Sequence, residues 1–131
     1  MPAKILIVED NPDSREILRI QIERLGYEVL EALSGEEAIE KALAENPDLI
    51  IMDIKLPGMN GIEAAMTLKQ NSKTSQVPII AHSAWKEEKE KALRAGMVEF
   101  LPKPTSPNVL REALQRFLES KTGKKLVADS G

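Results

Sequence analysis

Acidic side chains directly follow two short apolar stretches of the sequence. Glu9 and Asp10 come after the apolar run at residues 5–8, and Asp53 comes after the run at residues 49–52. Carboxylates that lie close together repel one another, and a bound divalent cation removes that repulsion. Ligands that are all oxygen atoms suit magnesium, with manganese as the alternative. If the fold brings these three residues together, they form a site for a hard metal ion.

A hydroxyl and a lysine follow two further apolar runs. Ser83 comes after the run at residues 77–81, and Lys103 comes after the run at residues 98–101. Beside a metal ion, these are the groups that can stabilise the charge on the oxygens of a phosphoryl group during its transfer. An ionised aspartate can serve as the nucleophile. Asp53 is therefore the candidate phosphoacceptor, with Lys103 and Ser83 as its catalytic partners.

Strands and helices are predicted to alternate along the chain. A weaker apolar run at residues 27–32 brings the expected number of strands to five, and apolar residues at spacings of three and four between the runs predict helices. This alternation is typical of a doubly wound α/β fold with a parallel sheet covered on both faces. In such sheets ligands bind at the carboxyl ends of the strands, where all the candidate site residues are expected to lie.

The predicted helices differ in how firmly the sequence anchors them. The first has four apolar residues at helical spacing, namely Ile17, Leu18, Ile22 and Leu25. The fourth follows the charged run at residues 86–91 and has only Ala92 and Leu93 as anchors, so we expect it to be the least tightly held. Ser34, Asn60 and Ser106 are predicted helix caps.

Composition and charge exclude several classes of function. A chain of 131 residues is long enough for one domain with its own core. A net charge of −3 argues against direct nucleic-acid binding, which needs a concentrated basic face. The absence of cysteine excludes disulfides and thiolate sites, and a single histidine leaves little for zinc. Because no apolar run is long enough to span a membrane, we expect a cytoplasmic protein without membrane contact.

The order and spacing of these motifs resemble those of a response-regulator receiver domain of the flavodoxin-like fold. The resemblance is carried by residues 5–11, residues 47–61, Ser83-Ala84 and Lys103-Pro104, and it covers about residues 3–121. It implies a five-stranded parallel sheet in the order 2-1-3-4-5 with five helices, two on one face and three on the other. We therefore expect a receiver domain over residues 1–122 and a flexible tail over residues 123–131.

The resemblance also implies a role for each matched acidic residue. Asp53 would accept a phosphoryl group from a histidine kinase or a histidine phosphotransfer protein. Glu9 and Asp10 would bind magnesium together with Asp53, and Lys55 would contribute its backbone carbonyl to the metal. The chain would then be a phosphoprotein of a two-component phosphorelay that catalyses only its own phosphorylation and dephosphorylation.

Three further residues would carry the switch. Ser83 would be the hydroxyl that moves to bond the phosphoryl group, and Lys103 would contact the same group. Phe100 falls on the family's switch-aromatic position, so any inward rotation would be driven by packing, without the hydroxyl of a tyrosine. The expected result is a change in the surface around helix 4, strand 5 and helix 5 that controls the binding of a downstream protein.

Two residues beside the switch serine differ in their expected roles. Trp85, the only tryptophan, lies two residues after Ser83, and we expect it to restrict attacking water together with Lys55 on the other side of the site. His82 should point away from the site if strand alternation continues through Ser83. We interpret His82 as a packed histidine without a catalytic role.

Several alternatives remain open. The chain is either a stand-alone regulator, which its methionine start favours, or a receiver domain excised from a hybrid histidine kinase. An aspartate-nucleophile phosphatase would carry its nucleophile after the first strand, whereas the isolated Asp53 follows the third. A flavin or nucleotide carrier is disfavoured because the acidic residues 9–13 would repel a phosphate. The downstream partner and the oligomeric state are not predicted.

Overall fold

The computed structural model describes the backbone of residues 2–122 and the side chains of residues 2–118, so the predicted tail lies outside the described residues. Five parallel strands form one sheet in the order β2-β1-β3-β4-β5. Their bounds are β1 Lys4–Val8, β2 Glu28–Ala32, β3 Leu49–Met52, β4 Ile79–Ser83 and β5 Glu99–Pro102. The predicted fold class and strand order are confirmed.

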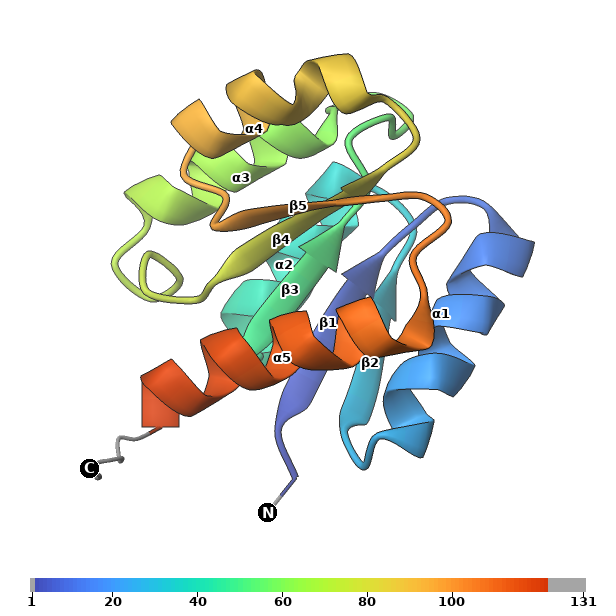
Figure 1. Ribbon diagram of the computed structural model, residues 1–131. Coiled ribbons are helices and arrows are strands. Elements are labelled where there is room, and N and C mark those ends of the chain that lie inside the picture. The colour runs from blue at the N-terminus through green and yellow to red at the C-terminus, as the bar shows by residue number, and fades with distance from the viewer. Residues whose placement is uncertain (1, 123–131) are drawn as a thin grey trace.

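Helices cover both faces of the sheet (Figure 1). They are α1 Pro12–Arg24, α2 Gly35–Glu45, α3 Gly61–Gln70, α4 Lys89–Arg94 and α5 Pro107–Thr122, with a short 3-10 helix, η1 Lys86–Glu88, directly before α4. Helices α1 and α5 pack on one face, and α2, α3 and α4 pack on the other. Within residues 2–122, no helix has the length and apolar character needed to cross a membrane.

The central strands are buried on both faces. Along β1, Ile5 and Ile7 point into the cluster beneath α1 and α5, whereas Leu6 and Val8 point into the cluster beneath α2, α3 and α4. Because successive side chains of a strand point to opposite faces, a strand buried on both faces must be apolar at every position. This requirement explains the continuous apolar runs and fixes the strand ends at which polar residues can begin.

The fourth strand begins later than the sequence predicted. The apolar run starts at Val77, but β4 starts at Ile79. Pro78 has no N–H with which to join the ladder, although its carbonyl accepts the Ile50 N–H at 3.0 Å. Ser83 is the last residue of β4, paired in register with Pro102 of β5.

Side-chain caps confirm the predicted helix starts. The Ser34 Oγ atom accepts the Glu37 N–H at the start of α2, and Ser106 Oγ accepts the Val109 N–H at the start of α5. At α3, Asn60 and Glu63 form a reciprocal capping box. Each cap fixes the residue at which a helix begins, and therefore the course of the loop that leads into it from the site edge of the sheet.

Two predicted core anchors are wrong. Ile17 of α1 is 60% exposed, because Leu18 and Ile22, one turn apart, already fill the side of the helix that faces the sheet. Leu93 of α4 is 43% exposed, so this six-residue helix buries only Ala92. The contact of α4 with the core is correspondingly small.

Candidate active site

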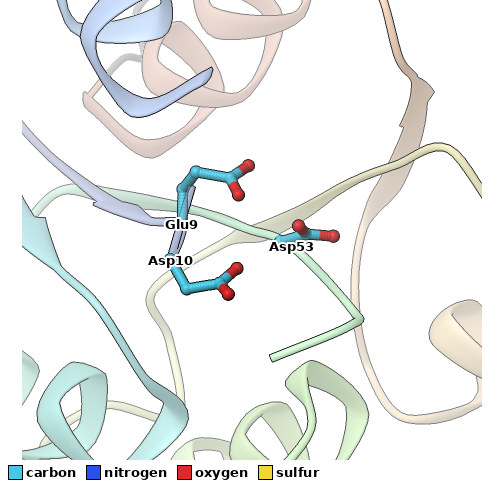
Figure 2. Close-up of side chains that lie close together, drawn as sticks. All are labelled: Glu9, Asp10 and Asp53. Carbon is cyan, nitrogen blue, oxygen red and sulfur yellow. The ribbon is translucent and has the colours of Figure 1, made fainter. Parts of the chain in front are cut away.

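The three predicted acidic residues meet at the carboxyl ends of β1 and β3 (Figure 2). Val8 and Met52 are paired in register, so Glu9 and Asp53 follow at the same level on adjacent strands. The Asp53 N–H continues the pairing by donating to the Val8 carbonyl at 3.0 Å. One carboxylate oxygen from each of Glu9, Asp10 and Asp53 lies within 4.8 Å of the others.

Burial differs among these carboxylates. Glu9 is 2% exposed and Asp53 is 7% exposed, whereas Asp10 is open to solvent. Burial raises the pKa of the Glu9 carboxyl, and the nearby charge of Asp53 raises it further, although a hydrogen bond from Lys103 opposes both effects. Ionisation of all three carboxylates therefore costs free energy when no cation is near, and nearby positive charge offsets that cost.

Lys103 supplies that positive charge. Its Nζ atom lies 2.5 Å from Glu9 Oε1 and 3.0 Å from Asp53 Oδ2. Burial disfavours the charged form of this lysine, but the hydrogen bonds to Glu9 and Asp53 outweigh burial, so the pKa of Lys103 is raised and the ammonium stays protonated at neutral pH. The Lys103 N–H donates to the Ser83 carbonyl at 3.0 Å, and the peptide bond to Pro104 is cis.

Ser83 lies fully buried at the end of β4, on the same edge of the sheet. Its Oγ atom accepts the N–H of Trp85 at 3.0 Å, which leaves the hydroxyl hydrogen free to be donated elsewhere. Because Trp85 directly precedes η1 and α4, this hydrogen bond joins the strand-end hydroxyl to the start of the fourth helix.

Phe100 of β5 is buried in the core cluster that contains Ala81, Ala92 and Met97. Its ring already faces the interior, with 9% of the residue exposed. Ala92 is the only buried residue of α4, and it shares with the Phe100 ring the core cluster beneath α2, α3 and α4.

Lys55 and Trp85 face each other across the mouth of the site. The Lys55 Nζ atom lies 5.2 Å from the centroid of the Trp85 ring, within the range of a cation–π interaction. The backbone N–H of Lys55 also points to Asp53 Oδ1, at 3.4 Å. The segment after β3 and the segment after β4 are therefore in contact above the candidate acceptor.

His82 occupies the opposite face of β4 from Ser83. It lines a hollow of about 400 Å³ between α1 and the segment that follows β5, together with Ile17, Lys103 and Pro104. Burial lowers the pKa of His82 to about 4, and the charge of Lys103 contributes to the same effect. The imidazole is therefore neutral at pH 7, as expected for a packed histidine.

Two residues that contact the backbone of the site were not predicted from the sequence. The Arg15 Nη1 atom donates to the Glu9 carbonyl at 3.0 Å while Nε pairs with Glu31 at 2.8 Å, which ties the acidic pair to α1 and β2. Gly61 begins α3 directly against the backbone of Asp53. An arginine in a first helix gives no local signal of such a contact. The spacing of Asn60 and Glu63 marked the start of α3 but gave no signal of the close contact at Gly61.

Comparison with known proteins agrees with the observed fold. Residues 5–115 match the sequence model of the response regulator receiver domain. The chain is 35% identical over 120 residues to the polar-differentiation response regulator DivK of Brucella anthropi, covering 90% of this chain and 98% of DivK. It is 38% identical over 120 residues to the alkaline phosphatase synthesis transcriptional regulatory protein PhoP of Bacillus subtilis, covering 90% of this chain but 49% of PhoP.

A solved receiver-domain structure also matches this chain. The receiver domain of the sensor histidine kinase PA1611 from Pseudomonas aeruginosa, which has a magnesium ion coordinated in its active-site cleft, matches with a TM-score of 0.85 at 33% identity, covering 90% of this chain and 98% of that domain. The fold and the acidic site thus define a doubly wound α/β signalling domain. The chain belongs to the response regulator receiver domain family of two-component systems.

Proposed function

We propose that Asp53 is the phosphoacceptor of this receiver domain and that its phosphorylation switches the binding of a partner protein. The observation that carries the proposal is the position of the Asp53 carboxylate, 3.0 Å from the Lys103 ammonium and beside Glu9 and Asp10. The Lys103 ammonium stabilises the ionised form of this nearly buried carboxylate. The neighbouring acidic pair, Glu9 and Asp10, favours the binding of a second cation.

The residues present fit a magnesium ion. All the candidate donors are oxygen atoms, and carboxylates from two adjacent strand ends converge within 4.8 Å. Glu9, Asp10 and Asp53 would hold the ion together with the backbone carbonyl of Lys55, and manganese could take the same ligands. When bound, the metal neutralises charge on the oxygens of the incoming phosphoryl group.

Asp53 would act as the nucleophile. One of its carboxylate oxygens forms the new bond to phosphorus while the bond from phosphorus to the donor histidine nitrogen breaks and leaves its electron pair on that nitrogen. The Lys103 ammonium stabilises charge on the transferring oxygens, and its raised pKa keeps it protonated for this role. The donor would be a histidine kinase or a histidine phosphotransfer protein.

The hydrogen bond between Ser83 and Trp85 suggests how the signal leaves the site. If the Ser83 hydroxyl donates to the new phosphoryl oxygen, its Oγ moves toward Asp53 and draws the Trp85 N–H with it. The 3-10 helix η1 and then helix α4 follow Trp85 in the chain, and α4 buries only Ala92, so its population of conformations can shift at low cost. Phe100 packs in the same core cluster as Ala92. The surface affected by the switch would comprise α4, β5 and α5.

The similarity to DivK over 98% of its length supports a stand-alone regulator, which we favour. The similarity to a receiver domain of a sensor kinase supports the alternative, a receiver domain that belongs to a hybrid kinase. Both alternatives have the same chemistry at Asp53. They differ only in whether the partner that reads the switch surface is part of the same polypeptide.

Intact-mass spectrometry tests the proposal directly. We expect the full chain, incubated with acetyl phosphate and magnesium, to gain the mass of one phosphoryl group, and we expect little or no gain when EDTA replaces magnesium. Treatment with hydroxylamine should remove the adduct, because it cleaves an acyl phosphate and leaves a phosphorylated hydroxyl intact. No adduct with magnesium, or an adduct that resists hydroxylamine, would contradict the assignment of an aspartate acceptor.

Removal of the contact between Lys55 and Trp85 is expected to shorten the lifetime of the phosphorylated state. In both Lys55→Ala and Trp85→Ala, water should reach the phosphoryl group more easily, and hydrolysis should accelerate about two- to fivefold, as expected for a contact worth about 0.5–1 kcal/mol. Loss of the adduct with time, followed by intact mass after the donor is removed, measures this rate.

The double variant separates a shared contact from two independent effects. If the two side chains act together, Lys55→Ala combined with Trp85→Ala should hydrolyse no faster than the faster single variant. Lys86→Ala, a neighbouring exposed lysine in η1, provides the control and should leave the lifetime unchanged. Unchanged lifetimes in both single variants would refute the role of this contact.

A further inference from the structure

A groove of about 470 Å³ lies between α3 and α4, helices that run side by side on one face of the sheet (Figure 1). Its apolar lining comes from Ile62 and Met66 of α3 and from Ala95 after α4. Met66 is 48% exposed, so nearly half of this apolar side chain is open to a partner within the groove. None of the acidic-site residues lines this groove.

The charged side chains that line the groove are all cations. They are Lys69, Lys91 and Arg94, in a chain whose net charge is −3. Lys69 is held in place because its Nζ atom donates to the carbonyls of Ser75 and Val77 at 3.1 and 2.8 Å. The groove therefore has an apolar floor, formed by Ile62, Met66 and Ala95, and a positively charged rim, formed by these three cations.

The two cations from α4 remain available to a partner. Lys91 forms no ion pair within the described residues, and its side chain is exposed. Arg94 pairs only with Glu90, at 3.0 Å, and both side chains are more than two-thirds exposed, at 73% and 79%. Such an exposed pair contributes little to stability and can exchange its carboxylate for one from another molecule.

We propose that this groove is a docking site for an acidic segment of a partner protein. The segment would place an aliphatic side chain against Met66 and its carboxylates beside Lys91 and Arg94. An amphipathic helix with an acidic flank has this combination of groups, and opposite charge at the rim favours its encounter with the groove. The inference goes beyond the phosphoryl switch, since binding here requires neither Asp53 nor a phosphoryl group.

Titration of the full, isotope-labelled chain with two designed peptides tests the proposal. Each has about 20 residues, longer than the ~12–15 residues below which isolated helices are marginal, with leucines at spacings of three and four. One carries glutamate at its polar positions and the other carries lysine. We expect the glutamate peptide to shift the backbone amide signals of Met66, Lys91 and Ala95, and the lysine peptide to leave them unchanged. Shifts centred on another face, or no shifts at all, would overturn the proposal.

Charge reversal at the rim provides the second test. The double variant Lys91→Glu, Arg94→Glu should weaken binding of the glutamate peptide about tenfold, since two exposed pairs worth up to about 1 kcal/mol each are lost and each glutamate repels the peptide. The double variant Lys86→Glu, Lys89→Glu makes the same change in net charge outside the groove and should alter the affinity less than about twofold. Equal weakening by this control would mean a general effect of net charge and would refute the site.

A third variant tests the apolar floor. Met66→Asp should also weaken binding of the glutamate peptide about tenfold, because it removes apolar contact and adds a repelling charge. Circular dichroism checks that each variant is folded, and the acetyl phosphate reaction is run on the same samples. The adduct reports on the phosphoacceptor and the peptide titration on the groove, so failure of one result is distinguishable from failure of the other.

Discussion

Asp53→Asn is expected to abolish formation of the phosphoryl adduct. The side chain keeps its shape, but the amide is no longer an anionic nucleophile and provides a poorer metal ligand. Removal of a nucleophile typically lowers the rate by about 10⁴-fold or more, so no adduct should be visible by intact mass during a reaction that saturates the unmodified chain. The hydrogen bond between Lys103 and Asp53 Oδ2 can persist with the amide oxygen, so the fold should survive.

Asp13→Asn is the matched control for this change. Asp13 is exposed in the first turn of α1, so the same chemical substitution is made outside the acidic cluster. This variant should gain the phosphoryl mass at the rate of the unmodified chain. An adduct that forms equally fast in Asp53→Asn would place the acceptor at another residue and would refute the proposed function.

Gly61→Ala is expected to destabilise the domain by about 3 kcal/mol or more, because overpacking here meets backbone and not a flexible side chain. A Cβ atom at this position would lie 2.1 Å from the Asp53 carbonyl oxygen and 2.9 Å from Ile54 Cα. The backbone of the β3–α3 loop must move, which would also break the 2.8 Å hydrogen bond from the Gly61 N–H to the Ile54 carbonyl. Urea unfolding followed by circular dichroism measures the loss.

Gly26→Ala separates close packing from the general effect of replacing glycine. Gly26 has a φ of +97° and nothing within 4 Å of a built Cβ, so its substitution costs only the backbone strain, about 1–2 kcal/mol. The Gly61 variant should also accept the phosphoryl group more slowly, because Asp53 is displaced, whereas the Gly26 variant should not. Equal stability losses and equal phosphorylation rates in the two variants would disprove the role of the Gly61 contact.

Much of the fold could be predicted because its signals are local. The apolar runs of β1 and β3 mark strands buried on both faces, and the Asn60–Glu63 spacing marks the start of α3. The errors arise where local signals conflict. Val77 has the side chain of a strand residue, but Pro78 delays the ladder to Ile79. Ile17 has helical spacing, but the chain alone cannot tell which of two adjacent apolar residues faces the sheet.

The candidate site could be predicted only as a set of residues at one edge of the sheet. Glu9, Asp10 and Asp53 were expected to meet because parallel strands bring their carboxyl ends together. The geometry of Lys103 depends on the course of the chain after β5, which its own sequence does not determine. The contacts of Arg15 and Gly61 with the site backbone likewise depend on tertiary packing and leave no local pattern.

The hydrogen bond from Lys103 to Glu9 joins residues 94 positions apart in the chain. Closing so long a stretch of chain costs more entropy than forming a local contact, so we expect this contact to form late in folding. A partly folded chain that has assembled only β1, β2 and β3 would have the acidic residues and the candidate acceptor in place, but Lys103 would not yet be positioned beside them. If Asp53 is the phosphoacceptor, competence to receive a phosphoryl group would therefore arise only when β5 and Lys103 have joined the sheet.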